Sequence, residues 1–247
     1  MRLKAIIQYD GTNFSGYQIQ PNGRTVQGKL EAVLAKMHKG EHIRVTASGR
    51  TDQGVHAVGQ TIHFDTSLTI PVANWLKALN TMLPDDIEVK DIAEASADFH
   101  ARFDVREKEY RYVILNTNER DLFKRHYCHH VPQPLQLERM QQAAKYLVGT
   151  HDFSSFCAAN NNVKGDKIRT ITGISIEQDA ANQIIIKVRG TGFLYNMVRI
   201  ITGTLLEVGL GDREPENVEE IISSLDRSKA GKTAPPQGLY LWDVDYY

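Results

Sequence analysis

Residues 43–64, IRVTASGRTDQGVHAVGQTIHF, contain two apolar stretches separated by a short polar loop. Ile43–Ala47 and Val55–Phe64 are rich in β-branched residues, and apolar side chains recur at even spacing in the second stretch, which predicts two strands. The loop Gly49–Gly54 lies between them and carries a glycine at each end, as turns commonly do. We therefore place this strand–loop–strand unit at the centre of the first half of the fold.

The segments on either side extend this unit into a repeated order of elements. In the first half we predict a strand over Leu3–Tyr9, a helix over Thr25–Lys39, the two strands above, a helix over Pro71–Leu83 and a strand over Ile87–Ala93. In the second half we predict strands over Tyr110–Leu115, Ile168–Ile176, Ile184–Val188 and Leu239–Val244, and helices over Leu137–Leu147, Leu194–Val208 and Glu216–Leu225.

Two successive β-α-β-β-α-β units predict an α+β fold made of two ferredoxin-like halves. We expect mainly antiparallel sheets with helices on one face and an active-site cleft between the halves. The boundary falls in the charged segment after residue 104. It gives an N-terminal half over residues 1–104 and a C-terminal half over residues 105–247.

The composition and net charge of the chain limit how it could bind a nucleic acid. The chain has 247 residues and a net charge of −1, so a nucleic-acid partner requires its basic residues to be clustered. Residues 100–112, HARFDVREKEYRY, combine cations with aromatic rings, as proteins that bind unpaired bases do. The alternative is a solvated strand of mixed charge. The two cysteines, Cys128 and Cys157, form no CxxC pair, which favours a cytoplasmic protein without disulfides.

Several motifs are absent. The sequence contains no GxxxxGK[ST] loop, no GxGxxG fingerprint and no HExxH, which disfavours nucleotide hydrolysis and dinucleotide binding. Residues 126–130, HYCHH, lack the second pair of ligands that a structural zinc site needs, so we predict no metal. No apolar run approaches the roughly 20 residues that span a bilayer.

Reactive chemistry is concentrated in the Gly49–Gly54 loop. Arg50 and Asp52 lie two residues apart, and a nearby guanidinium favours the ionised form of a carboxylate. An ionised carboxylate acts as a nucleophile or a base. The alternative is an ordinary hairpin loop in which Asp52 caps a turn and Arg50 forms a surface ion pair.

Residues 49–57, GRTDQGVHA, resemble the catalytic motif of the TruA family of tRNA pseudouridine synthases, and the resemblance covers nearly the whole chain. Further similar blocks occur in the family's order at residues 9–21 (YDGTNFSGYQIQP), 25–31 (TVQGKLE), 99–102 (FHAR), 108–112 (KEYRY), 151–156 (HDFSSF), 192–199 (GFLYNMVR) and 234–241 (APPQGLYL). Two positions depart from the family's pattern. Tyr17 stands where Trp is usual, and Glu109 where a small or polar residue is usual.

The resemblance implies an isomerase that converts uridine to pseudouridine in the tRNA anticodon stem-loop, at tRNA positions 38, 39 and 40, as a homodimer and without a cofactor. Asp52 would be the essential nucleophile or base. Tyr110 would stack on the target uracil, Arg199 would pair with Asp52, and Arg50 would help to extrude the nucleotide. Glu109 would place a negative charge beside the stacking residue.

Two alternatives compete with this function. The first is a non-catalytic RNA-binding module, suggested by the basic and aromatic residues of segment 100–112. The second is a carboxylate-based hydrolase. We rank it last, because such enzymes normally use two carboxylates and the Gly49–Gly54 loop supplies one.

Overall fold

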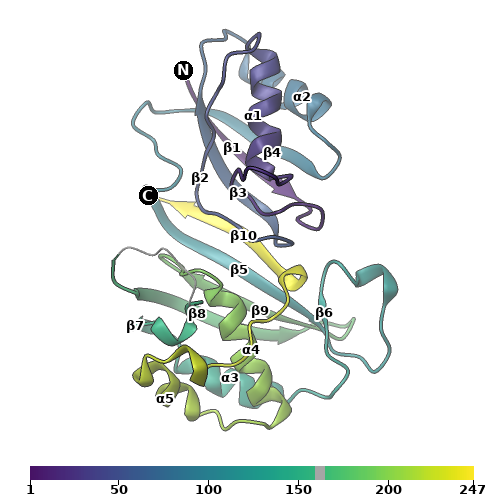
Figure 1. Cartoon of the computed structure of the whole chain (residues 1–247), viewed down its shortest axis with the longest axis vertical. Coiled ribbons are helices and arrows are strands. Elements are labelled where there is room, and N and C mark those ends of the chain that lie inside the picture. The colour runs from purple at the N-terminus through teal and green to yellow at the C-terminus, as the bar shows by residue number, and fades with distance from the viewer. Residues whose placement is uncertain (159–164) are drawn as a thin grey trace. The chain divides into compact units, whose positions relative to one another are not determined.

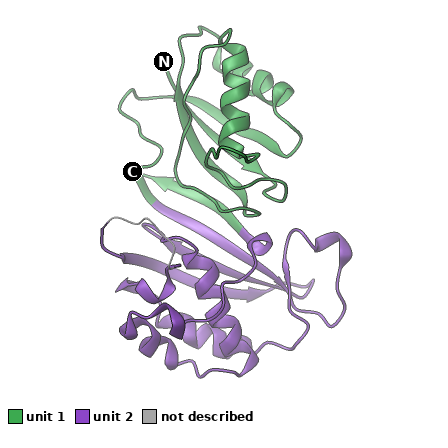
Figure 2. Ribbon diagram, viewed as in Figure 1, with its two compact units in different colours: residues 1–106, 240–247 green, residues 107–239 purple. Residues whose placement is uncertain are grey.

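A computed structural model describes residues 1–158 and 165–247. The described chain forms two compact units (Figures 1 and 2). Unit 1 comprises Met1–Arg106 and Tyr240–Tyr247, and unit 2 comprises Glu107–Leu239. Helices and mostly antiparallel strands make up both units, which confirms the predicted α+β class.

Unit 1 contains β1 (Arg2–Tyr9), α1 (Val26–Met37), β2 (Thr46–Ala47), β3 (His56–Asp65), α2 (Val72–Met82), β4 (Ile87–Ala95) and most of β10 (Leu239–Tyr246). Strand β1 lies between β3 and β4 and is antiparallel to both. Strand β2 pairs antiparallel with β3 near its end, and β10 pairs parallel with β3 near its start. The order β4-β1-β3-β2 is that of a ferredoxin-like sheet.

Alternating burial fixes which face of this sheet is covered. Along β1 the buried side chains are Leu3, Ala5, Ile7 and Tyr9, at the period of two that is expected of a strand with one face in the core. Helix α1 begins after Thr25, whose side chain accepts a hydrogen bond from the Gly28 backbone N–H and so caps the first turn. Helices α1 and α2 contact each other.

Unit 2 contains β5 (Val105–Leu115, whose first two residues belong to unit 1), η1 (Leu122–Lys124), β6 (His129–His130), α3 (Leu137–Lys145), β7 (Gly149–Asp152), η2 (Ser154–Phe156), β8 (Ile168–Gln178), β9 (Gln183–Gly190), α4 (Met197–Leu210), α5 (Asn217–Ser224), η3 (Arg227–Lys229) and η4 (Pro236–Gly238). Its strands follow the order β5-β9-β8-β7 with antiparallel neighbours, and β6 pairs parallel with β5. Helix α3 packs on α4 and β8.

Several elements differ from the sequence-based expectation. Only Thr46–Ala47 of the predicted strand Ile43–Ala47 pairs with β3. Helix α4 begins at Met197 rather than Leu194, because Asn196 adopts a left-handed backbone with φ of 60° that cannot continue a helix. The last strand, which we placed in the C-terminal half, pairs with β3, so Tyr240–Tyr247 belongs to unit 1. The short strands β6 and β7 were not predicted.

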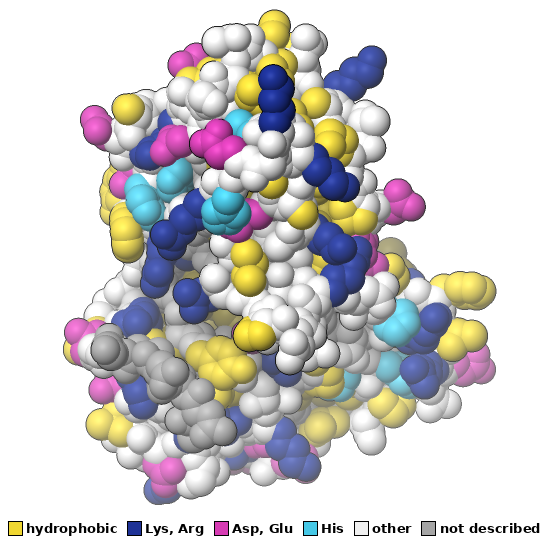
Figure 3. Space-filling view, turned by 45° about the horizontal axis from the view of Figure 1, so that its top comes forward, with side chains coloured by type: hydrophobic (Ala, Val, Ile, Leu, Met, Phe, Trp, Pro, Cys, Tyr) yellow, Lys and Arg dark blue, Asp and Glu magenta, His cyan; other side chains and the backbone are white. Residues whose placement is uncertain are grey.

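Cationic side chains are grouped in places despite the near-neutral net charge. On the face drawn in Figure 3, several Lys, Arg and His side chains lie side by side at the upper left of the view. Proteins that bind nucleic acid commonly show local grouping of this kind, and it is the grouping that matters when total charge is low.

Candidate active site

Arg50 and Asp52 lie in the loop that connects β2 to β3 in unit 1. A hydrogen bond from the Val55 backbone N–H to the Asp52 carbonyl oxygen (3.1 Å) closes the turn, and Gly54 takes a φ of 77° within it. The Asp52 residue is half-buried, whereas Arg50 is exposed. Both side chains therefore belong to a tight turn that leaves them partly accessible to solvent.

Hydrogen bonds hold Gly49 and Thr51, the two residues that flank Arg50 in this turn. The buried Tyr9 hydroxyl lies 2.7 Å from the Thr51 hydroxyl, and the Tyr17 backbone N–H donates to the Thr51 carbonyl oxygen at 3.0 Å. The Gln60 amide donates to the Gly49 carbonyl oxygen at 2.8 Å. These contacts restrain Gly49 and Thr51, so the turn is positioned before any ligand binds, as a catalytic carboxylate requires.

Gln60 is itself fully buried, at 0% exposure, and its amide oxygen accepts a hydrogen bond from the Ser48 hydroxyl at 2.6 Å. We did not predict Ser48, Gln60 or Tyr9 as supporting residues. A signal was present: Gln60 is a polar residue within a predicted strand, and a polar side chain that is buried there needs a partner. The partner was not identifiable from the sequence.

The opening segment packs closely against the turn. A Cβ atom on Gly11 would lie 2.0 Å from the Val55 carbonyl oxygen, so a side chain there would displace the backbone of the loop. Gly16 has a φ of 103°, in the left-handed region that glycine tolerates, and a Cβ there would lie 3.0 Å from the Thr51 carbonyl oxygen. The Gly11 backbone N–H also donates to Nδ1 of His56 at 2.9 Å. Segment 9–17 thus packs directly against the loop and supports its backbone.

Two buried tyrosines beside the loop, Tyr9 and Tyr17, differ in the hydrogen bonding of their hydroxyls. Burial raises the pKa of Tyr9, while hydrogen bonds with Thr51 and Gln60 lower it by less, so its hydroxyl stays neutral. Burial also raises the pKa of Tyr17 well above its usual value. Among the described residues the Tyr17 hydroxyl has no hydrogen-bond partner. Tyr17 is the position at which the chain departs from the family's usual Trp, whose ring carries no hydroxyl.

The electrostatic partner expected for Asp52 within its own loop is not there. In the part of the chain that the structure describes, Arg50 makes no hydrogen bond or ion pair, so it is not the group that holds the Asp52 carboxylate. The expectation that adjacency in sequence brings the two charges together was therefore wrong. An exposed guanidinium without a partner remains accessible to a phosphate or a base.

Tyr110 lies in the middle of β5, where Val188 of β9 is its register partner. Its residue is 8% exposed, and its ring packs edge-on against Phe193 with centroids 5.0 Å apart. The neighbouring Tyr112 is buried on the same face and donates its hydroxyl to the Pro235 carbonyl oxygen at 2.8 Å. Tyr110 is thus held by strand pairing and by an aromatic neighbour.

Arg199 lies in the first turn of α4. Its Nε donates to the Ala234 carbonyl oxygen at 2.7 Å, and its Nη1 donates to the Asn196 side-chain oxygen at 2.8 Å. The bond to Ala234 connects the blocks 192–199 and 234–241, which are distant in sequence. Asp52 and Arg50 belong to unit 1, and Tyr110 and Arg199 to unit 2. The pairing of Asp52 with Arg199 stays a prediction.

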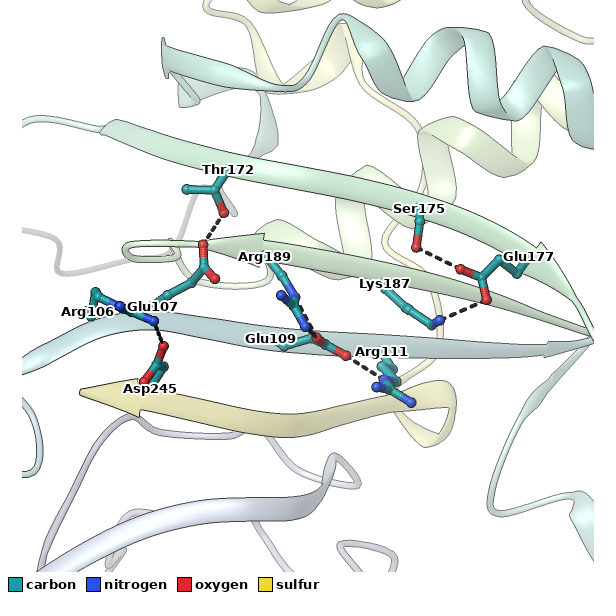
Figure 4. Close-up of polar contacts among 10 residues, drawn as sticks. All are labelled: Arg106, Glu107, Glu109, Arg111, Thr172, Ser175, Glu177, Lys187, Arg189 and Asp245. Atoms are coloured by element: carbon teal, nitrogen blue, oxygen red, sulfur yellow. Dashed lines mark hydrogen bonds and ion pairs between the residues drawn. The ribbon is translucent and has the colours of Figure 1, made fainter. Parts of the chain in front are cut away.

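The Glu109 carboxylate does not lie beside the Tyr110 ring, although the two residues are adjacent in sequence. Its carboxylate accepts hydrogen bonds from Nε of Arg111 at 2.6 Å and from Nε of Arg189 at 2.7 Å (Figure 4). Burial raises the pKa of Glu109, but these two guanidiniums outweigh burial and the net pKa is lowered. Since side chains alternate along a strand, Glu109 and Tyr110 point to opposite faces. The negative charge is therefore compensated and directed away from Tyr110.

The described residues contain neither a cluster suited to a metal ion nor a helix suited to a membrane span. Within residues 1–158 and 165–247, no group of three or more His, Cys, Asp or Glu side chains is arranged to hold a metal ion. In the same ranges no helix is both long and apolar enough to cross a membrane.

Comparison with known proteins adds independent findings. A family model described as tRNA pseudouridine synthase matches residues 5–104 and 143–247, so Tyr110 falls between the two matched stretches. A protein named tRNA pseudouridine synthase A from Oceanobacillus iheyensis is 54% identical over 99% of this chain and 96% of its own length. Proteins of the same name from Geobacillus sp. and Halalkalibacterium halodurans are 56% and 57% identical, over 99% and 96% of this chain and 98% and 90% of their own lengths.

Proposed function

This chain belongs to the tRNA pseudouridine synthase family and is an isomerase that converts uridine to pseudouridine in tRNA; from that premise we propose that its targets lie in the anticodon stem-loop, at tRNA positions 38, 39 and 40. The similarity of nearly the whole chain to proteins named tRNA pseudouridine synthase A supports the proposal. Membership of this family sets aside the non-catalytic RNA-binding module and the carboxylate-based hydrolase.

We propose Asp52 as the essential nucleophile or base. The observation that carries this assignment is the anchored turn, in which buried Tyr9 and Gln60 fix the residues around a carboxylate that is only half-buried. The reaction breaks the N1–C1′ bond of uridine, forms a C5–C1′ bond, removes the proton from C5 and adds a proton to N1, so no oxidant or energy source is needed. Attack on the ribose, addition to the base and removal of a sugar proton each require this carboxylate to be ionised beside the nucleotide.

We propose that three further residues bind the target nucleotide. Tyr110 stacks on the uracil, which contributes about 1–3 kcal/mol per base, and Phe193 fixes the orientation of its ring. Arg199 pairs with the Asp52 carboxylate and keeps it ionised, supported by the two hydrogen bonds that orient its guanidinium. Arg50, exposed and without a partner in the described chain, occupies the place that the extruded nucleotide leaves.

We also propose that the enzyme is a cytoplasmic homodimer. The chain carries a net charge of −1, so one copy offers limited attraction for a polyanion, and two copies on one tRNA double the number of phosphate contacts. Sedimentation of the purified protein tests this part, and a monomer at micromolar concentration with full activity contradicts it.

Product mapping tests the function. Purified protein is incubated with unmodified tRNA in the absence of any cofactor, and pseudouridine is mapped chemically. We expect product at positions 38–40 with the wild type and with Gln53→Ala, an exposed neighbour in the same loop, and none with Asp52→Ala. Product from Asp52→Ala contradicts the role of Asp52. Product confined to another part of the tRNA contradicts the anticodon assignment.

A further inference from the structure

Helix α4 begins in a way that the usual helix cap does not explain. The residue before its first turn, Asn196, has a φ of 60° and a ψ of 8°, in the left-handed region where Asn is one of the few residues with a side chain that is commonly found. A helix normally begins after an extended residue whose side-chain oxygen accepts a hydrogen bond from a backbone N–H of the first turn. The Asn196 side chain makes no such bond. Its amide therefore serves another group.

That group is the Arg199 guanidinium, in the first turn of the same helix. Nη1 of Arg199 donates to the Asn196 side-chain oxygen at 2.8 Å. Residues three apart are close neighbours on a helix surface, so the short amide reaches the guanidinium directly. Both residues are half-buried, which limits the competition of water for this bond. Asn196 therefore restricts the orientation of the Arg199 side chain.

The second acceptor on Arg199 is a backbone carbonyl whose position is fixed by packing. Nε of Arg199 donates to the Ala234 carbonyl oxygen at 2.7 Å, and the Ala234 backbone N–H donates back to the Arg199 carbonyl oxygen at 3.1 Å. The segment that contains Ala234 packs directly on α4, because a Cβ atom on Gly203 would lie 1.7 Å from the Lys232 carbonyl oxygen. A single substitution can therefore remove the Asn196 acceptor and leave the Ala234 carbonyl in place.

Neither of these two acceptors neutralises the Arg199 charge. Both are neutral oxygens, one of a side-chain amide and one of a peptide group, and together they engage two of the five N–H groups of the guanidinium. A carboxylate at position 196 would also hold the guanidinium, but it would compete with a second carboxylate for the same charge. The pair of neutral acceptors thus orients a cation and preserves its charge, which is the arrangement that a catalytic ion pair requires.

We propose that Asn196 is a positioning residue for pseudouridine formation, and that its side-chain oxygen holds the Arg199 guanidinium in the orientation that serves the catalytic carboxylate. This inference rests on the proposed function, which pairs Arg199 with Asp52. The competing explanation is that Asn196 is present only because its backbone tolerates the left-handed angle. Glycine tolerates that angle better still, so the two explanations differ in what they predict for Asn196→Gly.

The test compares Asn196→Gly with Asn182→Gly. Asn182 lies in the hairpin between β8 and β9 with a φ of 56° and is exposed, so it controls for the replacement of a left-handed Asn by Gly. Single-turnover formation of pseudouridine at saturating tRNA gives the rate, filter binding gives the affinity, and urea denaturation checks that both variants are folded. We expect Asn196→Gly to lower the rate by about 10- to 100-fold with tRNA affinity within about twofold of wild type, and Asn182→Gly to change neither.

A double-mutant cycle separates positioning of Arg199 from a purely structural role. Arg199→Lys keeps a cation but lacks the planar fork that two acceptors can orient. In that background we expect Asn196→Gly to lower the rate by less than about threefold, because the group that Asn196 positions is already gone. The proposal is overturned if Asn196→Gly reacts within twofold of wild type, if it lowers the rates of wild type and Arg199→Lys by the same factor, or if its loss lies in tRNA affinity. Arg199→Lys at the wild-type rate, or a wild type that forms no pseudouridine, contradicts the proposed function instead.

Discussion

The Asp52 loop and the Tyr110 strand position their side chains in different ways. Asp52 lies in a turn outside regular structure, and single side chains such as Gln60 and Tyr9 hold that turn. Tyr110 lies within β5, where eight consecutive residues of the strand are in register with β9. A loop held by side chains can be loosened by one substitution, whereas a paired strand cannot. The two regions should therefore respond differently to changes that leave the reactive residue itself untouched.

Removal of the Tyr110 ring should produce the largest effect in the strand region. Tyr110→Ala removes a base-stacking surface and leaves a cavity beside Phe193, so we expect tRNA KM to rise roughly 5- to 100-fold and stability to fall by about 3 kcal/mol. Tyr110→Phe keeps the ring and removes only the hydroxyl, so it distinguishes the contribution of the hydroxyl from that of ring stacking. Steady-state kinetics and urea denaturation measure the two effects, and unchanged KM in Tyr110→Ala contradicts the stacking role.

Loosening the loop without touching Asp52 should cost turnover. Gln60→Leu leaves the Ser48 hydroxyl and the Gly49 carbonyl oxygen without their buried partner. We expect kcat to fall by about 10- to 100-fold, because a carboxylate displaced by about 1 Å loses its reacting geometry, and stability to fall by about 1–3 kcal/mol. Affinity for tRNA should change little. If kcat stays within twofold of wild type, the comparison between loop and strand fails.

Breaking polar contacts on the strand, by contrast, should affect stability alone. Glu109→Gln weakens the contacts with Arg111 and Arg189 on the face opposite Tyr110, so we expect a stability loss of about 1–2 kcal/mol with kcat within twofold of wild type. The folded-state pKa of Glu109 is lowered from 4.5, so its contribution is present above that pH and is lost as the pH falls below it. The stability difference between wild type and variant should therefore shrink below about pH 4.5 in urea titrations.

The two tyrosines under the loop should give the smallest effects, with opposite signs. Tyr9→Phe leaves the Thr51 hydroxyl without its partner and should destabilise the protein by about 1 kcal/mol. Tyr17→Phe removes a buried hydroxyl that has no partner among the described residues, and should stabilise it by up to about 1 kcal/mol. Thermal denaturation of both variants measures these changes in stability. A change of the same sign in both variants contradicts the assigned hydrogen bonds.

Local patterns predicted most of the elements but few of their long-range partners. The alternation along β1 and the apolar stripe of α1 are properties of neighbouring residues, so both were predictable. The pairing of β10 with β3 joins residues about 180 positions apart, and no local pattern specifies it. The start of α4 depends on the backbone angle of Asn196, a residue type that is compatible with either conformation.

The candidate site shows the same division. Asp52 stood out because a short turn bounded by glycines held several polar residues, and the ordered family blocks supported it. The hydrogen bonds that hold the turn come from Tyr9, 42 residues from Thr51, and from Gln60, 11 residues from Gly49, and neither separation leaves a periodic signal in the sequence. Adjacency in sequence predicted two contacts wrongly. Arg50 is exposed and does not contact Asp52, and Glu109 lies on the opposite face of the strand from Tyr110.

The central claim is that Asp52 supplies the reacting carboxylate of an already positioned loop. Single-turnover formation of pseudouridine by Asp52→Asn, together with its tRNA affinity, tests this claim most directly, because Asn keeps the shape of the side chain and removes its charge. We predict wild-type affinity with no product formed over many wild-type turnover times. Product formation by Asp52→Asn at a rate within about tenfold of wild type would contradict the account.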